Sequence, residues 1–170
     1  LGDATYEQIR TALSEGDFVP LETCETPDGL AALDAMIARL DPGDDLPYPL
    51  EVSVLDHPMA NAFALPGGRV VLFRGLIEEA SGPDEVAAVL AHEIGHALDV
   101  LYLDDDMRSQ WLDTRGIDGA WWPDSGANDF HLGAGDFAEA VAVIIAGSPS
   151  DAYGPDFTLE QLAFVRELLP

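Results

Sequence analysis

The sequence of 170 residues contains no lysine and only one cysteine, Cys24. A single cysteine excludes an intramolecular disulfide and also a structural zinc site built from several cysteines. Because lysine is missing, the sequence has only 7 basic residues, all arginine, against 32 aspartates and glutamates, and the net charge is -25. Such a surface repels phosphate groups and anionic lipid. We therefore expect no nucleic-acid partner and no membrane partner.

Two kinds of apolar segment are also missing. No apolar run approaches the roughly 18 residues of a membrane span, and the N-terminal LGDATYEQIR lacks the basic and apolar parts of a signal peptide. We expect a soluble monomer that is cytoplasmic or secreted; because the chain starts at Leu1 rather than Met, its location stays open. A hydrophobic content of 48% predicts one ordinary core and a single domain over residues 1–170.

The first half of the sequence changes from helical to strand periodicity. Apolar residues recur at helical spacing over residues 3–15 and 28–40, and a proline-rich loop follows, which begins with DPGDD at 41–45. Residues 50–56, 61–65 and 69–73 read as short strands, the last two joined by the turn Pro66–Gly68. These features predict a small, mostly antiparallel sheet.

The second half reads as mainly helical. A long helix is expected from Pro83 to Leu103, followed over 104–135 by a structured loop with room for one short helix, in which Asp104 to Asp106 are solvated charges. Asp136 opens a further helix, and a last one covers 159–169. The prediction is an α+β domain with N-terminal helices (1–45), a sheet and long helix (46–103), and a loop and helices (104–170).

The long helix contains HEIGH, His92 to His96. Four residues make nearly one helical turn, so both imidazoles project from one face and can bind one metal ion. Glu93 lies about 100° around the helix axis, within reach of a water on that metal. Imidazole ligands favour zinc over magnesium or calcium. The pattern predicts a zinc hydrolase with Glu93 as general base.

Two histidines leave the zinc site incomplete, so a third ligand must come from elsewhere. The segment GDFAEAVAVIIAG has one charged residue, Glu139, between Phe137 and Ala146. A buried carboxylate is costly unless a cation meets it, which makes Glu139 the best candidate. Asp136 is the rival, although an acid at the cap or in the first turn of a helix needs no metal.

A family resemblance supports this interpretation. NAFALPGGRVVLFRGLI (61–77) followed by DEVAAVLAHEIGHALD (84–99) resembles the M48 family of zinc metallopeptidases. The later GDFAEAVA is more similar to the third-ligand helix of anthrax lethal-factor-like peptidases, whose glutamate falls on Glu139, whereas the M48 pattern would select Asp136. Both groups are gluzincins, so the resemblance implies a minimal zincin-like fold with Zn2+ bound by His92, His96 and Glu139.

The resemblance also implies functional residues outside the metal site. The strand Asn61, Ala62, Phe63 and Ala64 is the edge to which an extended peptide substrate adds. Such sites usually contain a group that stabilises the oxyanion, and His131, eight residues before Glu139, is the candidate. Asp99, one turn after His96, is a candidate hydrogen-bond acceptor for a ligand imidazole.

The function predicted from these residues is a zinc endopeptidase that acts on peptides or proteins. Two alternatives stay open: a peptidase toxin directed at one target protein, and a zinc-bound scaffold that binds peptides with little or no cleavage. The absence of a tyrosine between Tyr102 and Tyr153, where such sites usually place one, favours the scaffold.

Overall fold

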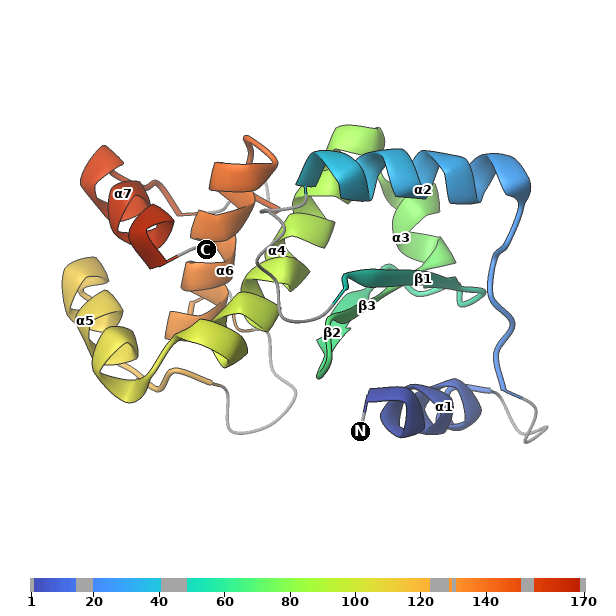
Figure 1. The fold of residues 1–170 in the computed structure, drawn as a ribbon, viewed down its shortest axis with the longest axis horizontal. Helices are drawn as coiled ribbons and strands as arrows, with labels where there is room; N and C mark the ends of the chain where they lie inside the picture. The colour runs from blue at the N-terminus through green and yellow to red at the C-terminus, as the bar shows by residue number, and fades with distance from the viewer. Residues whose placement is uncertain are drawn as a thin grey trace.

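The computed structural model describes residues 2–14, 20–40, 49–122, 129, 131–150 and 155–168. The expected DPGDD loop at 41–45 lies outside these residues. Figure 1 shows a small sheet with helices on both sides, beside a purely helical part. The α+β class is therefore confirmed in its coarse form. The N-terminal half holds α1 (Gly2–Ala12), α2 (Pro27–Leu40), β1 (Glu51–Leu55), β2 (Ala62–Leu65), β3 (Arg69–Phe73) and α3 (Arg74–Glu79).

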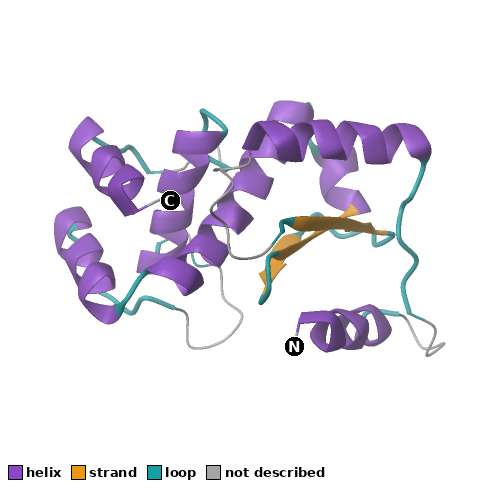
Figure 2. Ribbon diagram, in the orientation of Figure 1, coloured by secondary structure: helices purple, strands orange, loops and turns teal. Residues whose placement is uncertain are grey.

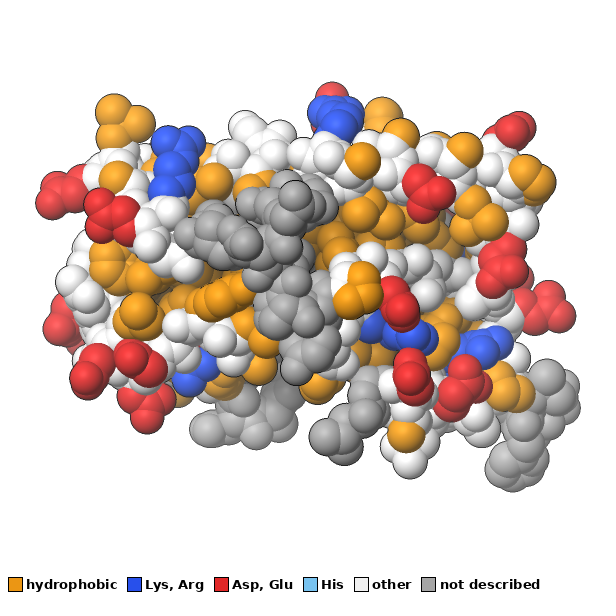
Figure 3. Space-filling model, viewed as in Figure 1, with side chains coloured by type: hydrophobic (Ala, Val, Ile, Leu, Met, Phe, Trp, Pro, Cys, Tyr) orange, Lys and Arg blue, Asp and Glu red, His pale blue; other side chains and the backbone are white. Residues whose placement is uncertain are grey.

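The remaining elements are all helices (Figure 2). They are α4 (Pro83–Tyr102), α5 (Asp105–Arg115), α6 (Gly133–Ile145) and α7 (Leu159–Leu168). None of the helices in the described part of the chain has the length and apolarity that a membrane span requires. Acidic side chains are scattered around the visible face rather than gathered in one patch (Figure 3).

The expectation of a mostly antiparallel sheet is wrong. The strand order is β1-β3-β2; β2 pairs with β3 antiparallel, and β1 pairs with β3 parallel. The turn Pro66–Gly68 joins β2 to β3 as expected, with positive φ at Gly67 and Gly68. The link between β1 and β2, residues 56–61, is long enough to cross the two strand spacings, about 10 Å, that β3 needs to enter between them. This order leaves β2 at an edge of the sheet.

The central strand β3 is buried on both faces, and its alternating side chains serve two hydrophobic clusters. Val71 and Phe73 contribute to the cluster on the α1 side, which includes Tyr6. Val70 and Leu72 contribute to the larger cluster, which extends over α2, α4 and α6. The sheet is thereby fixed between α1 and α4.

The first part of the segment that was expected to be a structured loop is the helix α5. The Asp104 side chain accepts a hydrogen bond from Met107 N at 2.9 Å, and Asp105 and Asp106 lie in the first turn of α5. Gly116, at φ 65, ends the helix. Because acids stabilise a helix N-terminus, these residues act as a cap and first turn rather than as loop charges.

Close packing of α4 against α6 depends on Gly95, inside the HEIGH segment. A Cβ added there would lie 2.6 Å from Ala138 Cα and 3.1 Å from Ala138 O. Backbone atoms cannot yield as a flexible side chain can, so any side chain at residue 95 must push the helices apart. The glycine therefore fixes the distance between the two helices that carry the candidate ligands.

We expect Gly95→Ala to lower the free energy of unfolding by up to about 2 kcal/mol, because an overpacking cost of about 1–3 kcal/mol outweighs the gain of about 1 kcal/mol in helix propensity. Urea unfolding measures the change. Gly119→Ala is the matched control, since its Cβ would meet only Leu132 Cδ2, at 3.9 Å. Equal stability of the two variants would contradict the close packing.

Candidate active site

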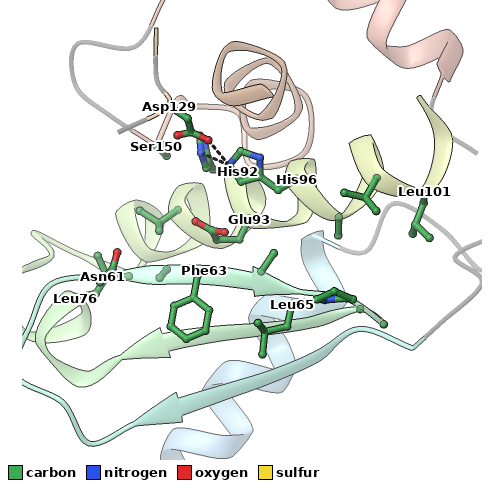
Figure 4. Close-up of a pocket in the computed structure, with 18 of the residues that line it drawn as sticks. Asn61, Phe63, Leu65, Leu76, His92, Glu93, His96, Leu101, Asp129 and Ser150 are labelled. Atoms are coloured by element: carbon green, nitrogen blue, oxygen red, sulfur yellow. Dashed lines mark hydrogen bonds and ion pairs between the residues drawn. The ribbon is translucent and has the colours of Figure 1, made fainter. Parts of the chain in front are cut away.

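A cleft of about 1030 Å³ runs between α4 and the edge strand β2. Figure 4 shows His92, Glu93 and His96 on the face of α4 that borders this cleft, with β2 as the opposite wall. The Phe63 and Leu65 side chains point from β2 away from α4, into the cluster on the α1 side of the sheet. The predicted substrate strand lines the cleft as well, from Asn61 to Ala64. The motif and the strand are thus brought together at one site.

The two histidines of the motif meet through their Nε2 atoms, which lie 3.1 Å apart. At Zn–N distances of about 2.0–2.1 Å, two ligand atoms in tetrahedral geometry are about 3.3 Å apart. The imidazole pair therefore fits a zinc ion, and zinc sites with an open position add a third protein ligand. Two carboxylates adjoin the pair, one next to each histidine.

Asp129 is the carboxylate next to His96. Its Oδ2 lies 3.1 Å from His96 Nε2, and one ligand atom from each of His92, His96 and Asp129 can be chosen so that all lie within 4.8 Å of one another. Burial is the largest influence on the His96 ring and disfavours its charged form, but the hydrogen bond to Asp129 and the charges of Glu93, Asp129 and Asp99 together outweigh it and raise the pKa of His96. Burial is likewise the largest influence on Asp129, and the hydrogen bond to His96 together with the charges of His96 and His92 outweighs it and lowers the pKa of the carboxyl group. Sequence reasoning did not identify Asp129, which precedes the expected helix in a segment without periodicity.

Glu139 is the carboxylate next to His92. Its side chain is 0% exposed, and its Oε1 lies 2.9 Å from His92 Nδ1. Ser150 binds both oxygens: its backbone N donates to Oε2 at 2.8 Å, and its hydroxyl donates to Oε1. Ser150 also lines the cleft and was not foreseen from the sequence. Glu139 thus adjoins the histidine pair at His92 Nδ1, whereas the two histidines meet through their Nε2 atoms.

Asp136, the rival ligand, binds elsewhere. It lies in the first turn of α6, which begins at Gly133 and not at Asp136. Its Oδ1 accepts from Trp111 Nε1 at 3.0 Å and from Arg115 Nε at 2.8 Å, and its Oδ2 accepts from Arg115 at 2.9 Å. The bidentate arginine supplies the positive charge that this buried carboxylate needs.

Asp99 is buried in a similar arrangement. Its Oδ1 accepts from Arg108 Nε at 2.9 Å, and its Oδ2 accepts from Trp121 Nε1 at 2.7 Å. Both oxygens therefore have partners other than an imidazole, and the expected role as acceptor for a ligand histidine stays a prediction. The bond to Trp121 has a further effect, because the next residue, Trp122, packs on His96 with ring centroids 5.3 Å apart.

Glu93 is almost fully buried at the centre of the cleft (Figure 4). Burial raises the pKa of its carboxyl group, and the charges of His96 and His92 and a hydrogen bond from the Ala64 backbone partly offset this effect. The Ala64 contact connects Glu93 to β2. A carboxylate with a raised pKa is a better proton acceptor, which suits a general base.

His131, the candidate for oxyanion stabilisation, is exposed and is not among the described residues that line the cleft. Its role stays a prediction. Trp122 does line the cleft, although the sequence analysis assigned it no function. Its proximity to His96 follows from the Asp99–Trp121 bond, a contact between distant segments that no local pattern signals.

Comparison with known proteins supports a metallopeptidase. Residues 30–112 match peptidase family M48. This region includes β1 to β3, α4 and most of α5 and ends before α6. The M48 match thus covers the histidine pair and the edge strand, and it leaves the third ligand undetermined.

Curated relatives agree with this match over a short region. The chain is 48% identical over 48 residues to the mitochondrial metalloendopeptidase OMA1 of Arabidopsis thaliana and 50% identical over 46 residues to that of Schizosaccharomyces pombe. These regions cover 28% and 27% of this chain, but only 10% and 14% of the relatives. The names place those relatives in mitochondria, unlike the cytoplasmic or secreted setting expected above.

Proposed function

We propose that this chain carries the active site of a zinc-dependent endopeptidase. The observation that carries the proposal is the position of Glu93, which faces one cleft together with His92, His96 and the edge strand β2. The match to a metallopeptidase family over the same region supports it. A base, a metal-binding pair and an unpaired strand edge are the components that peptide-bond hydrolysis requires.

We further propose His92, His96 and Glu139 as the protein ligands of zinc. Charge balance supports Glu139, because the buried acids Asp99 and Asp136 are each paired with an arginine. The partners described for Glu139 are Ser150 and His92, and neither is a permanent cation. A metal ion on His92 would supply the missing positive charge. Asp129 is the alternative third ligand, because its Oδ2 lies 3.1 Å from His96 Nε2, the atom that faces His92 Nε2, whereas the described contact of Glu139 is to His92 Nδ1.

The reaction follows from these positions. Zinc, when bound, acts as a Lewis acid that lowers the pKa of water and polarises the scissile carbonyl. Glu93 accepts the proton of the attacking water and transfers it to the amine nitrogen of the leaving peptide. The Ala64 N–H holds the Glu93 carboxylate at the edge strand, where the substrate backbone is expected to lie.

Hydrogen bonding in the sheet indicates which groups of β2 can receive the substrate. Phe73 N donates to Asn61 O at 3.0 Å, and Phe63 lies opposite Val71. Since antiparallel pairs exchange hydrogen bonds at alternate residues, the N–H and C=O groups of Ala62 and Ala64 point away from β3. We propose that an extended substrate pairs with the N–H and C=O of Ala62 and with the C=O of Ala64, because Glu93 occupies the Ala64 N–H. Main-chain pairing of this kind tolerates many sequences.

A metal-removal experiment tests the proposed activity. Protein treated with 1,10-phenanthroline and desalted is expected to lose cleavage of casein, and about one equivalent of zinc per chain is expected to restore it, because two imidazoles and a carboxylate form one zinc site. Gel analysis and mass spectrometry measure cleavage, and elemental analysis measures zinc. The untreated protein is the control.

Two outcomes would contradict the proposal. Zinc bound at about one equivalent without cleavage of casein or of a peptide library would favour the scaffold, or a toxin with one target. Cleavage that persists without metal would exclude a zinc-dependent mechanism. The first outcome leaves the metal site intact, whereas the second removes its role in catalysis.

A further inference from the structure

One end of the cleft is lined by large apolar side chains that are exposed. Val100 is 63% exposed, Trp122 40% and Leu101 36%, and all three line the same cleft as Glu93. In Figure 4, Leu101 lies at one end of the cleft, Asn61 lies at the other, and Glu93 lies between them. Exposed apolar groups that adjoin a reaction centre are suited to bind a ligand group.

We propose that this end of the cleft is a subsite for a large aliphatic or aromatic side chain of the peptide substrate. The inference rests on the proposed peptidase function and adds a preference to it. The walls are Ala97, Val100 and Leu101 from α4, and Trp122. Backbone pairing with β2 would carry no side-chain preference, so this subsite is the source of selectivity.

Trp122 is fixed in place rather than free to swing. Its ring packs on His96 at 5.3 Å between centroids, at an interplanar angle of 36°. The preceding Trp121 is held by its hydrogen bond to the buried Asp99. A rigid aromatic wall loses little conformational entropy when a ligand binds. The subsite is therefore largely formed before the substrate arrives.

The spacing along α4 gives the position of the selected residue. Val100 follows Glu93 by seven residues, which is about 10 Å along a helix. In Figure 4, β2 runs alongside α4, from Asn61 near Glu93 towards Leu101. An extended peptide on β2 rises about 3.3 Å per residue. The selected side chain is therefore expected about two or three residues from the scissile bond, on one side only.

The occupant is a substrate side chain because the apolar wall is continuous with the residues that would hold the reacting peptide bond. Ala97 follows His96 on α4 and lines the cleft, and Trp122 packs on His96. An occupant of this end would lie in line with a peptide paired to β2. An apolar side chain is favoured over a charged one, because Ala97, Val100, Leu101 and Trp122 carry no charge and the acidic groups of the described lining, Glu93 and Asp129, adjoin the histidine pair.

Peptide binding to an inactive variant tests the subsite. Zinc-loaded Glu93→Gln is titrated calorimetrically with two capped nonapeptides of Gly, Ser and Ala that differ only in a central Leu or Ser. We expect the Leu peptide to bind at least about tenfold more tightly, as is typical of an apolar pocket. Adding Val100→Asp is expected to abolish that difference. Leu159→Asp, at an 86% exposed leucine of α7, is the matched control and should preserve it.

Equal binding of the two peptides to Glu93→Gln would overturn the proposal, and this readout does not depend on the folding of Val100→Asp. A Leu preference that survives in a folded Val100→Asp variant would also overturn it. If the wild type cleaves, mass-spectrometric profiling of its products should show enrichment of apolar residues two or three positions from the cut. If it does not cleave but the Leu preference exists, the subsite stands and the peptidase function fails.

Discussion

Zinc-loaded Glu93→Gln is expected to cleave casein about 10²–10⁴-fold more slowly than the wild type, the range by which a general base contributes to catalysis. Glutamine has nearly the same shape and can still accept the hydrogen bond from Ala64, but it cannot accept a proton from water. The position of Glu93 between the histidine pair and β2 leads us to expect this loss in kcat. Initial rates at saturating substrate measure it.

Zinc content is the control for this variant. Glu93 is not among the proposed ligands, so Glu93→Gln should still bind about one zinc per chain and retain the wild-type circular dichroism spectrum. A variant that keeps zinc and also keeps wild-type activity would contradict the assignment of Glu93 as base. A variant that loses zinc would instead indicate that Glu93 holds the metal site together.

The elements with local signals could be predicted from the sequence. For α4, apolar periodicity, Pro83 in the first turn and the acids Asp84 and Glu85 place the helix at Pro83–Tyr102, within one residue of the expected end. The His92 and His96 convergence follows directly from the helical repeat. The strand Arg69–Phe73 has its expected bounds, because a compact apolar run that follows a turn is also a local signal.

Features that depend on distant contacts could not be predicted. The pairing partner of β1 depends on the path of residues 56–61, which pass β3 to reach β2. No local sequence pattern indicates that path. The short helix α3 was also missed, and α5 was anticipated only as one short helix without bounds somewhere in 104–135. The low apolar content of α5 hides its limits, and the cap at Asp104 is its clearest signal.

The surroundings of the histidine pair show the same limit. Asp129 and Ser150 belong to segments without periodicity, and they reach the site only through the fold. The burial of Glu139, in contrast, could be inferred from the apolar helix around it. The helical pattern does not indicate which group binds the Glu139 carboxylate.

Zinc affinity separates the two candidate carboxylates. We expect Glu139→Gln to weaken zinc binding by more than about 100-fold, because removal of a ligand should cost more than the 10–100-fold typical of residues that only orient a ligand. Asp129→Asn should weaken it by about tenfold or less, since in the proposed ligand set Asp129 only contacts His96. Competition with a chromophoric chelator measures both affinities at fixed pH.

The cobalt-substituted protein gives a second readout that does not depend on activity. Loss of a ligand changes the d–d absorption of Co2+, so Glu139→Gln should alter the spectrum while Asp129→Asn leaves it close to wild type. Thermal unfolding of the metal-free variants controls for damage to α6, because Ser150 can still bind the glutamine side chain. The opposite pattern, a large loss with Asp129→Asn and a loss within 100-fold with Glu139→Gln, would make Asp129 the ligand and Glu139 the residue that orients His92 through Nδ1.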